Sequence, residues 1–217
     1  MERIYLEEDK IKKFKFWNNY NEVVPTNFIG SWDIKNEKLC KRIINFFEEN
    51  ESLQLTGSVT DIPDKIGKKT TDITISPNNL KDIKFKYLNE YIYQLHKCFI
   101  DYLDQWPLLK TVFDKMHVGS FKIQKYSAND HFPRIHTGRA SLKSSHKVFA
   151  WMTYLNDVND GGATNFSHYD IKIKPETGKT LIWPAEWTHA HSDESVKSGV
   201  KYIVKGWIHF PPSDEIS

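Results

Sequence analysis

Two histidines suited to binding a metal are the residues of this chain most able to do chemistry. His136 opens the tripeptide His136-Thr137-Gly138, and His191 follows fifty-five residues later, ten residues before Lys201. Open non-haem iron(II) centres use two imidazoles and one carboxylate, and the carboxylate stands two residues after the first histidine. Gly138 occupies that place. The pattern therefore predicts a metal site that lacks one protein ligand.

The composition indicates one domain of ordinary size. The chain has 217 residues, of which 39% are apolar and 14% aromatic, enough to fill a core. Its formal charge of +2 comes from 30 basic and 28 acidic residues. Such a balance of charges does not indicate binding to nucleic acid or to an anionic membrane surface. The composition does not determine the oligomeric state.

Cysteine usage and the N-terminal sequence indicate a cellular compartment. Cys40 and Cys98 lie far apart and form no CxxC pair, so we expect buried thiols in a reducing environment. The first residues are charged, and no run approaches the roughly 18 apolar residues of a membrane span. We therefore expect a cytoplasmic location without membrane insertion.

The two histidines must be positioned by elements whose patterns change along the chain. Residues 37–48 have helical apolar spacing, and a longer helix is predicted from 77–79 to the stop at Pro107. Residues 69–75 alternate as a strand. From about residue 118 the chain has short β-like runs at 119–126, 147–155, 170–174, 179–183 and 200–210, with turns at 159–162 and 175–178.

These patterns predict a single α+β domain over residues 1–217. Residues 1–118 form a supporting region of helices and a strand, and residues 119–210 form a β core. The helices are expected to pack on one face of a sheet. His136 and His191 then lie beside strand ends, where side chains can point into the mouth of the core.

The order of motifs in the β-rich half resembles the prolyl 4-hydroxylase-like iron(II)/2-oxoglutarate-dependent oxygenases. The motifs are Tyr154-Leu155-Asn156-Asp157-Val158, Gly161-Gly162-Ala163-Thr164-Asn165-Phe166, Pro175-Glu176-Thr177-Gly178, Trp183-Pro184, Val196-x-x-Gly199-x-Lys201-Tyr202 and Trp207, preceded by Gln124-Lys125-Tyr126 and the His136 segment. Small members from marine phages and bacteria look most similar. The resemblance implies a double-stranded β-helix (jelly-roll) core and a dioxygenase that uses Fe(II), 2-oxoglutarate and O2.

The resemblance also implies roles for five residues. His136 and His191 match the metal-ligand positions of the family. Lys201 matches the basic residue that pairs with the far carboxylate of 2-oxoglutarate. Tyr154 is similar to the tyrosine that bonds the same carboxylate, and Tyr126 to one that lines the cavity near the metal. A buried dicarboxylate needs such partners at its distal end.

Gly138 departs from the hydroxylase pattern. H-x-G or H-x-A at this position is similar to the iron/2-oxoglutarate halogenases, in which a halide takes the open position and C–H becomes C–Cl. The resemblance therefore predicts a halogenase that uses chloride at Gly138. Arg139 and Ser141, just beyond the gap, are candidates for holding the anion.

Several residues keep alternatives for the metal site open. His189 lies two residues before His191, but the spacing to the downstream lysine favours His191 as the ligand, so His189 is predicted to support the site or face the substrate. Asp193 would complete an H-x-D with His191, yet we expect it in a loop. Asp130 and Glu186 are further carboxylates that could reach the metal.

Two other functions compete with the halogenase. The first is a hydroxylase whose third ligand is water or a carboxylate from elsewhere, and the second is a non-catalytic binding module with the same fold. The loop at 127–146 contains several basic residues, which suits an anionic small-molecule substrate such as an amino acid or nucleotide, and peptides are the substrates of better-known relatives.

Overall fold

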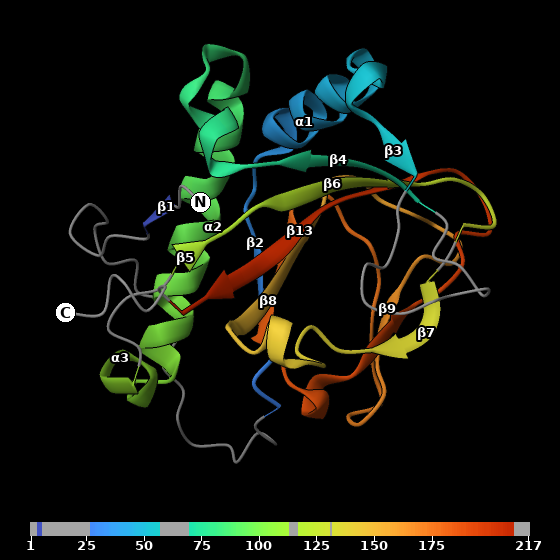
Figure 1. The fold of residues 1–217 in the computed structure, drawn as a ribbon. Helices are drawn as coiled ribbons and strands as arrows, with labels where there is room; N and C mark the ends of the chain where they lie inside the picture. The colour runs from blue at the N-terminus through green and yellow to red at the C-terminus, as the bar shows by residue number, and fades with distance from the viewer. Residues whose placement is uncertain (1–3, 6–26, 57–69, 113–116, 131, 211–217) are drawn as a thin grey trace.

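Two antiparallel sheets form the frame of the protein. The computed structural model describes residues 4–5, 27–56, 70–112, 117–130 and 132–210. Within these ranges the main sheet has the strand order β2-β11-β8-β13-β6-β4-β3, with β5 beside β13 and β1 beside β5. The small sheet has the order β10-β9-β12-β7. Figure 1 shows the helices on one side of the main sheet and strands β7 and β9 on the other.

The strands of the main sheet are β1 (Ile4–Tyr5), β2 (Gly30–Asp33), β3 (Leu55–Thr56), β4 (Thr71–Ile75), β5 (His117–Val118), β6 (Phe121–Tyr126), β8 (Lys147–Tyr154), β11 (Lys179–Pro184) and β13 (Lys201–His209). The small sheet consists of β7 (Phe132–His136), β9 (Thr164–Phe166), β10 (Ile171–Ile173) and β12 (His191–Asp193).

Helices α1 (Glu37–Glu49) and α2 (Lys86–Gln105) cover the outer face of the main sheet, and α3 (Leu108–Val112) follows α2. Tyr91 and Leu95 of α2 are fully buried in one cluster with Trp151 of β8. The Tyr91 hydroxyl donates to Thr153 Oγ1 at 2.8 Å. This core covers the helix-facing side of the main sheet, so the candidate site lies on the opposite side.

A second apolar cluster fills the space between the two sheets. Its buried members are Tyr126, Ala150, Met152, Tyr154, Val158, Phe166, Leu181, Trp183, Val196 and Ile203. Side chains alternate between faces along a strand. On β13, Val204 and Ile208 join the helix-side core, whereas Ile203 and Trp207 join the inner cluster. The odd-numbered residues of β13 therefore point towards the site.

The predicted elements are largely present, and two of the differences concern the long helix and the small sheet. Residues 77–81 form a 3-10 helix with a capping box between Ser76 and Asn79, and α2 begins only at Lys86. The pattern therefore placed the start of the long helix too early. The second difference is that β7, β9 and β12, the strands that carry much of the site, lie outside the predicted runs.

Both cysteines are buried free thiols, as predicted. Burial raises the pKa of the Cys40 thiol to about 11, so it stays protonated at physiological pH. Among the helices in the described ranges, none has the length and apolar character needed to span a bilayer.

Candidate active site

His136 and His191 lie directly opposite each other in the small sheet. His136 ends β7, His191 begins β12, and the two residues are Cα partners in the antiparallel ladder. Their ring centroids are 4.3 Å apart. Two residues that are fifty-five positions apart in sequence are thus brought together by strand pairing alone.

Backbone carbonyls fix the orientation of both imidazoles. Nδ1 of His136 lies 3.0 Å from the Arg134 carbonyl oxygen, and Nδ1 of His191 lies 2.9 Å from that of His189. A carbonyl only accepts, so each Nδ1 carries the proton and each lone pair is on Nε2. Metal-bound histidines are commonly held by such contacts. Burial lowers the pKa of both imidazoles, which favours the neutral form that a metal requires.

Gly138 has no room for a side chain. A Cβ at this position would lie 2.7 Å from Nε1 of Trp207 and 3.3 Å from Cβ of Ala185. The flanking residues fix the segment, because the Thr137 hydroxyl and the Arg139 N–H both donate to the Ala185 carbonyl. A carboxylate at position 138 would therefore require Trp207 to move, and the place of the absent ligand is lined by an indole edge.

No other carboxylate completes a metal site in the described part of the chain. No group of three or more His, Cys, Asp or Glu side chains there is arranged to hold a metal ion. Asp130 accepts from the Ser127 N–H at 2.8 Å. Glu186 pairs with Arg139, so the guanidinium proposed as an anion holder already has a carboxylate partner.

Asp193 lies in strand β12, and the expectation of a loop position was wrong. Its side chain is 5% exposed, and Oδ1 lies 3.5 Å from Nζ of Lys201. Thr164 Oγ1 donates to Oδ1 at 3.0 Å, and the Tyr126 hydroxyl donates to Oδ2 at 3.4 Å. Burial alone would raise the pKa of Asp193, but the charges of Lys201 and Lys205 outweigh it and hold the pKa well below its ordinary value.

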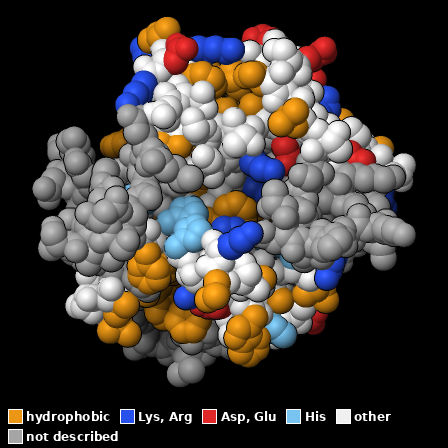
Figure 2. Space-filling model, viewed as in Figure 1, with side chains coloured by type: hydrophobic (Ala, Val, Ile, Leu, Met, Phe, Trp, Pro, Cys, Tyr) orange, Lys and Arg blue, Asp and Glu red, His pale blue; other side chains and the backbone are white. Residues whose placement is uncertain are grey.

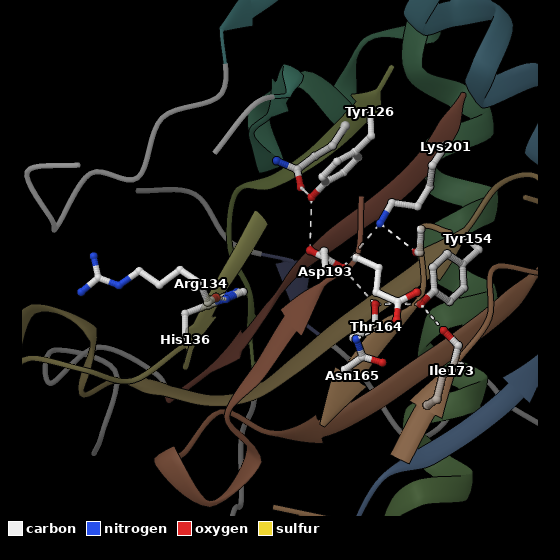
Figure 3. Close-up of polar contacts among 12 residues, drawn as sticks. Tyr126, Arg134, His136, Tyr154, Thr164, Asn165, Ile173, Asp193 and Lys201 are labelled. Atoms are coloured by element: carbon white, nitrogen blue, oxygen red, sulfur yellow. Dashed lines mark hydrogen bonds and ion pairs between the residues drawn. The ribbon is translucent and has the colours of Figure 1, made fainter. Parts of the chain in front are cut away.

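Lys201, Tyr126 and Tyr154 converge around Asp193, as Figure 3 shows. Lys201 is fully buried; its Nζ donates to the Gly162 carbonyl at 3.0 Å and lies 4.2 Å from the centroid of the Tyr126 ring. The Tyr154 hydroxyl donates to Thr164 Oγ1 at 2.8 Å. The three residues assigned to the cosubstrate are therefore adjacent, but their polar atoms already bond within the protein.

His189 contributes its backbone to the site. Residues 187–189 form a 3-10 helix rather than an extended strand, so strand alternation does not place the ring of His189 beside that of His191. Its Nε2 lies 2.7 Å from the Asn27 carbonyl oxygen. The His189 carbonyl, in contrast, accepts from His191 and orients that ring.

Lys205 is a site residue that sequence reasoning missed, and Thr164 and Trp207 were named only as motif residues without a role. Lys205 is half-buried and lies four residues beyond Lys201 on the same face of β13. Burial lowers the pKa of Lys205, and the nearby carboxylates of Asp193 and Asp72 oppose that effect. Alternate residues of a strand share a face, so counting every second residue from Lys201 would have identified both Lys205 and Trp207. Figure 2 shows histidine side chains at the surface, with Lys or Arg side chains beside them.

Comparison with known proteins finds similarity to oxygenases. Residues 121–209 match the family model of the 2OG-Fe(II) oxygenase superfamily. The probable prolyl 4-hydroxylase 9 of Arabidopsis thaliana is 23% identical over 142 residues, covering 54% of this chain and 49% of that protein. The human prolyl 4-hydroxylase subunit alpha-1 is 25% identical over 75 residues, covering 31% and 14%. The chain thus spans half or less of the length of these curated relatives.

Solved structures show the same fold. A viral collagen prolyl hydroxylase from Paramecium bursaria Chlorella virus-1 superposes with a TM-score of 0.61 and 16% identity, covering 88% of this chain and all of that chain. A Pseudomonas putida prolyl-4-hydroxylase gives 0.65 with 11% identity, covering 86% and 95%. The expected α+β architecture with a double-stranded β-helix core is confirmed.

Residues 121–209 are thus similar in sequence to the 2OG-Fe(II) oxygenase superfamily. The curated relatives and the solved structures of similar fold are named as prolyl hydroxylases. The superfamily implies Fe(II), 2-oxoglutarate and O2. Two imidazoles with Nδ1 bonded to carbonyls fit the metal. The fit to the cosubstrate is less complete, because the charge of Lys201 is already balanced by Asp193.

Proposed function

We propose that the protein is an Fe(II)- and 2-oxoglutarate-dependent oxygenase that hydroxylates an aliphatic C–H bond. One observation carries the proposal: His136 and His191 face each other at 4.3 Å, with both Nδ1 atoms bonded to backbone carbonyls. Pairing of β7 with β12 sets this geometry before any ligand is bound. The superfamily match and the hydroxylase names of the relatives support the same reaction class.

Each site residue has a task in this proposal. His136 and His191 hold the metal through Nε2, leaving more coordination positions for exogenous ligands than a site with three protein ligands would. When bound, Fe(II) with 2-oxoglutarate and O2 supplies the oxidising chemistry for C–H cleavage. Tyr126, Tyr154 and the Lys201–Asp193 pair form the polar end of the cosubstrate cavity. Water or another exogenous ligand completes the coordination that a protein carboxylate provides in related sites.

A proline-containing peptide is the substrate class that we propose first. Solved neighbours include a viral collagen prolyl hydroxylase and a prolyl hydroxylase in complex with a hypoxia inducible factor peptide fragment. Exposed apolar side chains lie close in sequence to both ligands: Ile135 precedes His136 and is 58% exposed, and Trp187, four residues before His191, is 68% exposed. Such side chains suit an extended peptide better than a small anion.

The test is cosubstrate turnover. Purified protein is incubated with Fe(II), 2-oxoglutarate, O2 and either proline-rich peptides or free amino acids, and succinate and substrate mass are measured. His136→Ala and His191→Ala are expected to abolish succinate formation and metal binding, whereas His168→Ala, at an exposed histidine outside the pair, retains both. Metal binding that survives both ligand substitutions would contradict the proposal. Tight 2-oxoglutarate binding without turnover of any substrate would favour the non-catalytic module.

Halogenation is the second candidate, and the glycine at position 138 favours it. The indole Nε1 of Trp207 beside Gly138 is an N–H donor at the place of the absent carboxylate, and Nζ of Lys147 lies 3.8 Å from the centroid of the same ring. An N–H donor polarised by a nearby cation suits an anion. The relatives described above are named as hydroxylases and lend this candidate no support.

Chloride distinguishes the two candidates. A halogenase predicts that chloride, added anaerobically to protein with Fe(II) and 2-oxoglutarate, changes the metal absorption band, and that product carries the chlorine isotope pattern. Trp207→Phe removes the donor and keeps most of the ring, so it should weaken the chloride effect. An absorption band that ignores chloride, with hydroxylated product only, excludes halogenation.

A further inference from the structure

We infer that Asp193 competes with the far carboxylate of 2-oxoglutarate for Lys201 and thereby determines how tightly the protein holds its cosubstrate. The inference rests on the proposed function, because it concerns the same cavity between the two sheets. Lys201 remains the anchor of the ligand carboxylate, and Asp193 keeps the lysine occupied until the ligand displaces it.

The ammonium of Lys201 is already surrounded by partners. An ammonium has three N–H donors. Nζ of Lys201 donates to the Gly162 carbonyl at 3.0 Å, lies 3.5 Å from Oδ1 of Asp193 and lies 4.2 Å from the centroid of the Tyr126 ring. The side chain of Lys201 is 0% exposed. Of these three neighbours Asp193 is the one that carries a charge, so an incoming carboxylate meets a lysine that is already paired.

Two tyrosines of the cavity also lead to Asp193. The Tyr126 hydroxyl donates to Oδ2 of Asp193 at 3.4 Å. The Tyr154 hydroxyl donates to Thr164 Oγ1 at 2.8 Å, and Thr164 Oγ1 donates to Oδ1 of Asp193 at 3.0 Å. An internal carboxylate therefore occupies the set of hydrogen-bond donors that a ligand carboxylate needs.

Strand pairing holds Asp193 between the proposed metal ligands and Lys201. Asp193 lies two residues after His191 on β12, and alternate residues of a strand share a face. Its Cα is paired across the ladder with that of Thr164. Figure 3 shows the Asp193 carboxylate between His136 and Lys201. A 2-oxo acid that binds a metal at one end and Lys201 at the other must therefore pass this carboxylate.

The charge of Asp193 opposes binding of a second carboxylate. Two carboxylates beside one buried ammonium repel each other, and the repulsion is strong where water is excluded. Either Asp193 turns away from Lys201 and gives up its contacts with Thr164 and Tyr126, or the ligand carboxylate stays outside the pair. Both routes reduce the affinity for 2-oxoglutarate. An uncharged side chain at position 193 would leave Lys201 to the ligand.

Calorimetric titration of 2-oxoglutarate into Mn(II)-loaded protein tests the inference without requiring turnover. Asp193→Asn is expected to lower the Kd by about 10-fold or more, because the ligand carboxylate then replaces the missing counter-ion of Lys201. The affinity for 2-oxopentanoate, which has a methyl group in place of the far carboxylate, should not increase. Asp104→Asn breaks an exposed ion pair with Lys110 and makes the same change in net charge, so it is the matched control and should leave the Kd unchanged.

Two further variants keep the test independent of the stability of Asp193→Asn. Thr164→Val retains the buried pair but removes the donor to Oδ1 of Asp193, and it should lower the Kd by about 3-fold. Adding Lys201→Met to Asp193→Asn should cancel the gain in affinity, because the ligand carboxylate then has no anchor. Thermal melts verify that each variant folds, and 2-oxoglutarate should raise the Tm of Asp193→Asn more than that of the unaltered protein.

The possible outcomes separate this inference from the proposed function. The inference is overturned if the unaltered protein binds 2-oxoglutarate as tightly as Asp193→Asn and Thr164→Val do, or if the gain persists without Lys201. An equal gain for 2-oxopentanoate would assign the effect to space rather than to charge, which also overturns it. If neither the unaltered protein nor Asp193→Asn binds 2-oxoglutarate, the proposed function itself fails.

Discussion

Replacing Asp193 by Asn should destabilise the protein because it leaves a buried charge without its counter-ion. Lys201 is 0% exposed and Asp193 is 5% exposed, so water cannot replace the lost partner. Asn keeps the shape of the side chain but has only one oxygen, so it can accept from either Thr164 or Tyr126 but not from both. Breaking a buried pair by removing one partner costs about 3 kcal/mol. For a domain of this size that corresponds to a Tm lower by about 6–12 °C.

The measurement is thermal unfolding followed by circular dichroism in metal-free buffer, with Asp193→Asn compared with the double variant Asp193→Asn, Lys201→Met. The double variant should recover most of the loss, since an apolar replacement of a buried pair is often neutral. A single variant within about 1 kcal/mol of the unaltered protein, or a double variant as unstable as the single one, would refute the reasoning.

The same pair predicts how stability depends on pH. The folded-state pKa of Asp193 is held below its unfolded-state value, so the contribution is fully present above the unfolded pKa of about 3.9 and is lost as pH falls through the lower folded pKa. The stability difference between the unaltered protein and Asp193→Asn should therefore be constant near neutrality. It should shrink only below about pH 4.

Three further predictions concern single positions. Gly138→Ala places a Cβ 2.7 Å from Nε1 of Trp207, so the free energy of unfolding in urea should fall by about 1–3 kcal/mol. Adding Trp207→Leu should recover part of this loss. An unchanged urea midpoint would mean that Trp207 is not held at this position. Tyr91→Phe removes the 2.8 Å hydrogen bond to Thr153 and should lower the free energy of unfolding by about 1 kcal/mol in the same assay. Metal affinity should stay the same. A change in metal affinity would show that the helix-side core influences the site. His191→Ala and His136→Ala should each weaken Co(II) binding at least about 10-fold by calorimetry. His189→Ala should weaken it less, because the backbone carbonyl of residue 189 remains to orient His191. Equal losses of Co(II) affinity in all three variants would assign the His189 ring a larger role.

Long strands and helices were predictable because each is long enough to show its character. The runs that became β6, β8, β11 and β13 are six to nine residues long and rich in β-branched and aromatic residues. Strands β9 and β12 have three residues each, too few for a period to emerge. The two histidines were assigned as candidate metal ligands through motif order, whereas the position of Asp193 depended on recognising β12 as a strand.

The charge arrangement could not be predicted from sequence for a different reason. Lys201 was assigned by its sequence separation from His191, and that separation does not indicate which carboxylate lies beside the lysine. The partner comes from the small sheet, while Lys201 comes from the main sheet. Only the packing of the two sheets shows that Lys201 already has a carboxylate partner.

Unequal support for the two histidines has a consequence for how tightly the centre can hold a metal. His191 belongs to β12, which is bonded to β9 on one side and β7 on the other, whereas β7 is the last strand of the small sheet within the described ranges. One proposed metal ligand therefore lies on a strand that is hydrogen-bonded on both sides, and the other lies on a strand that is hydrogen-bonded on one side. The conformational entropy lost on metal binding is therefore expected mainly at His136, and a substitution that rigidifies β7 should increase metal affinity most.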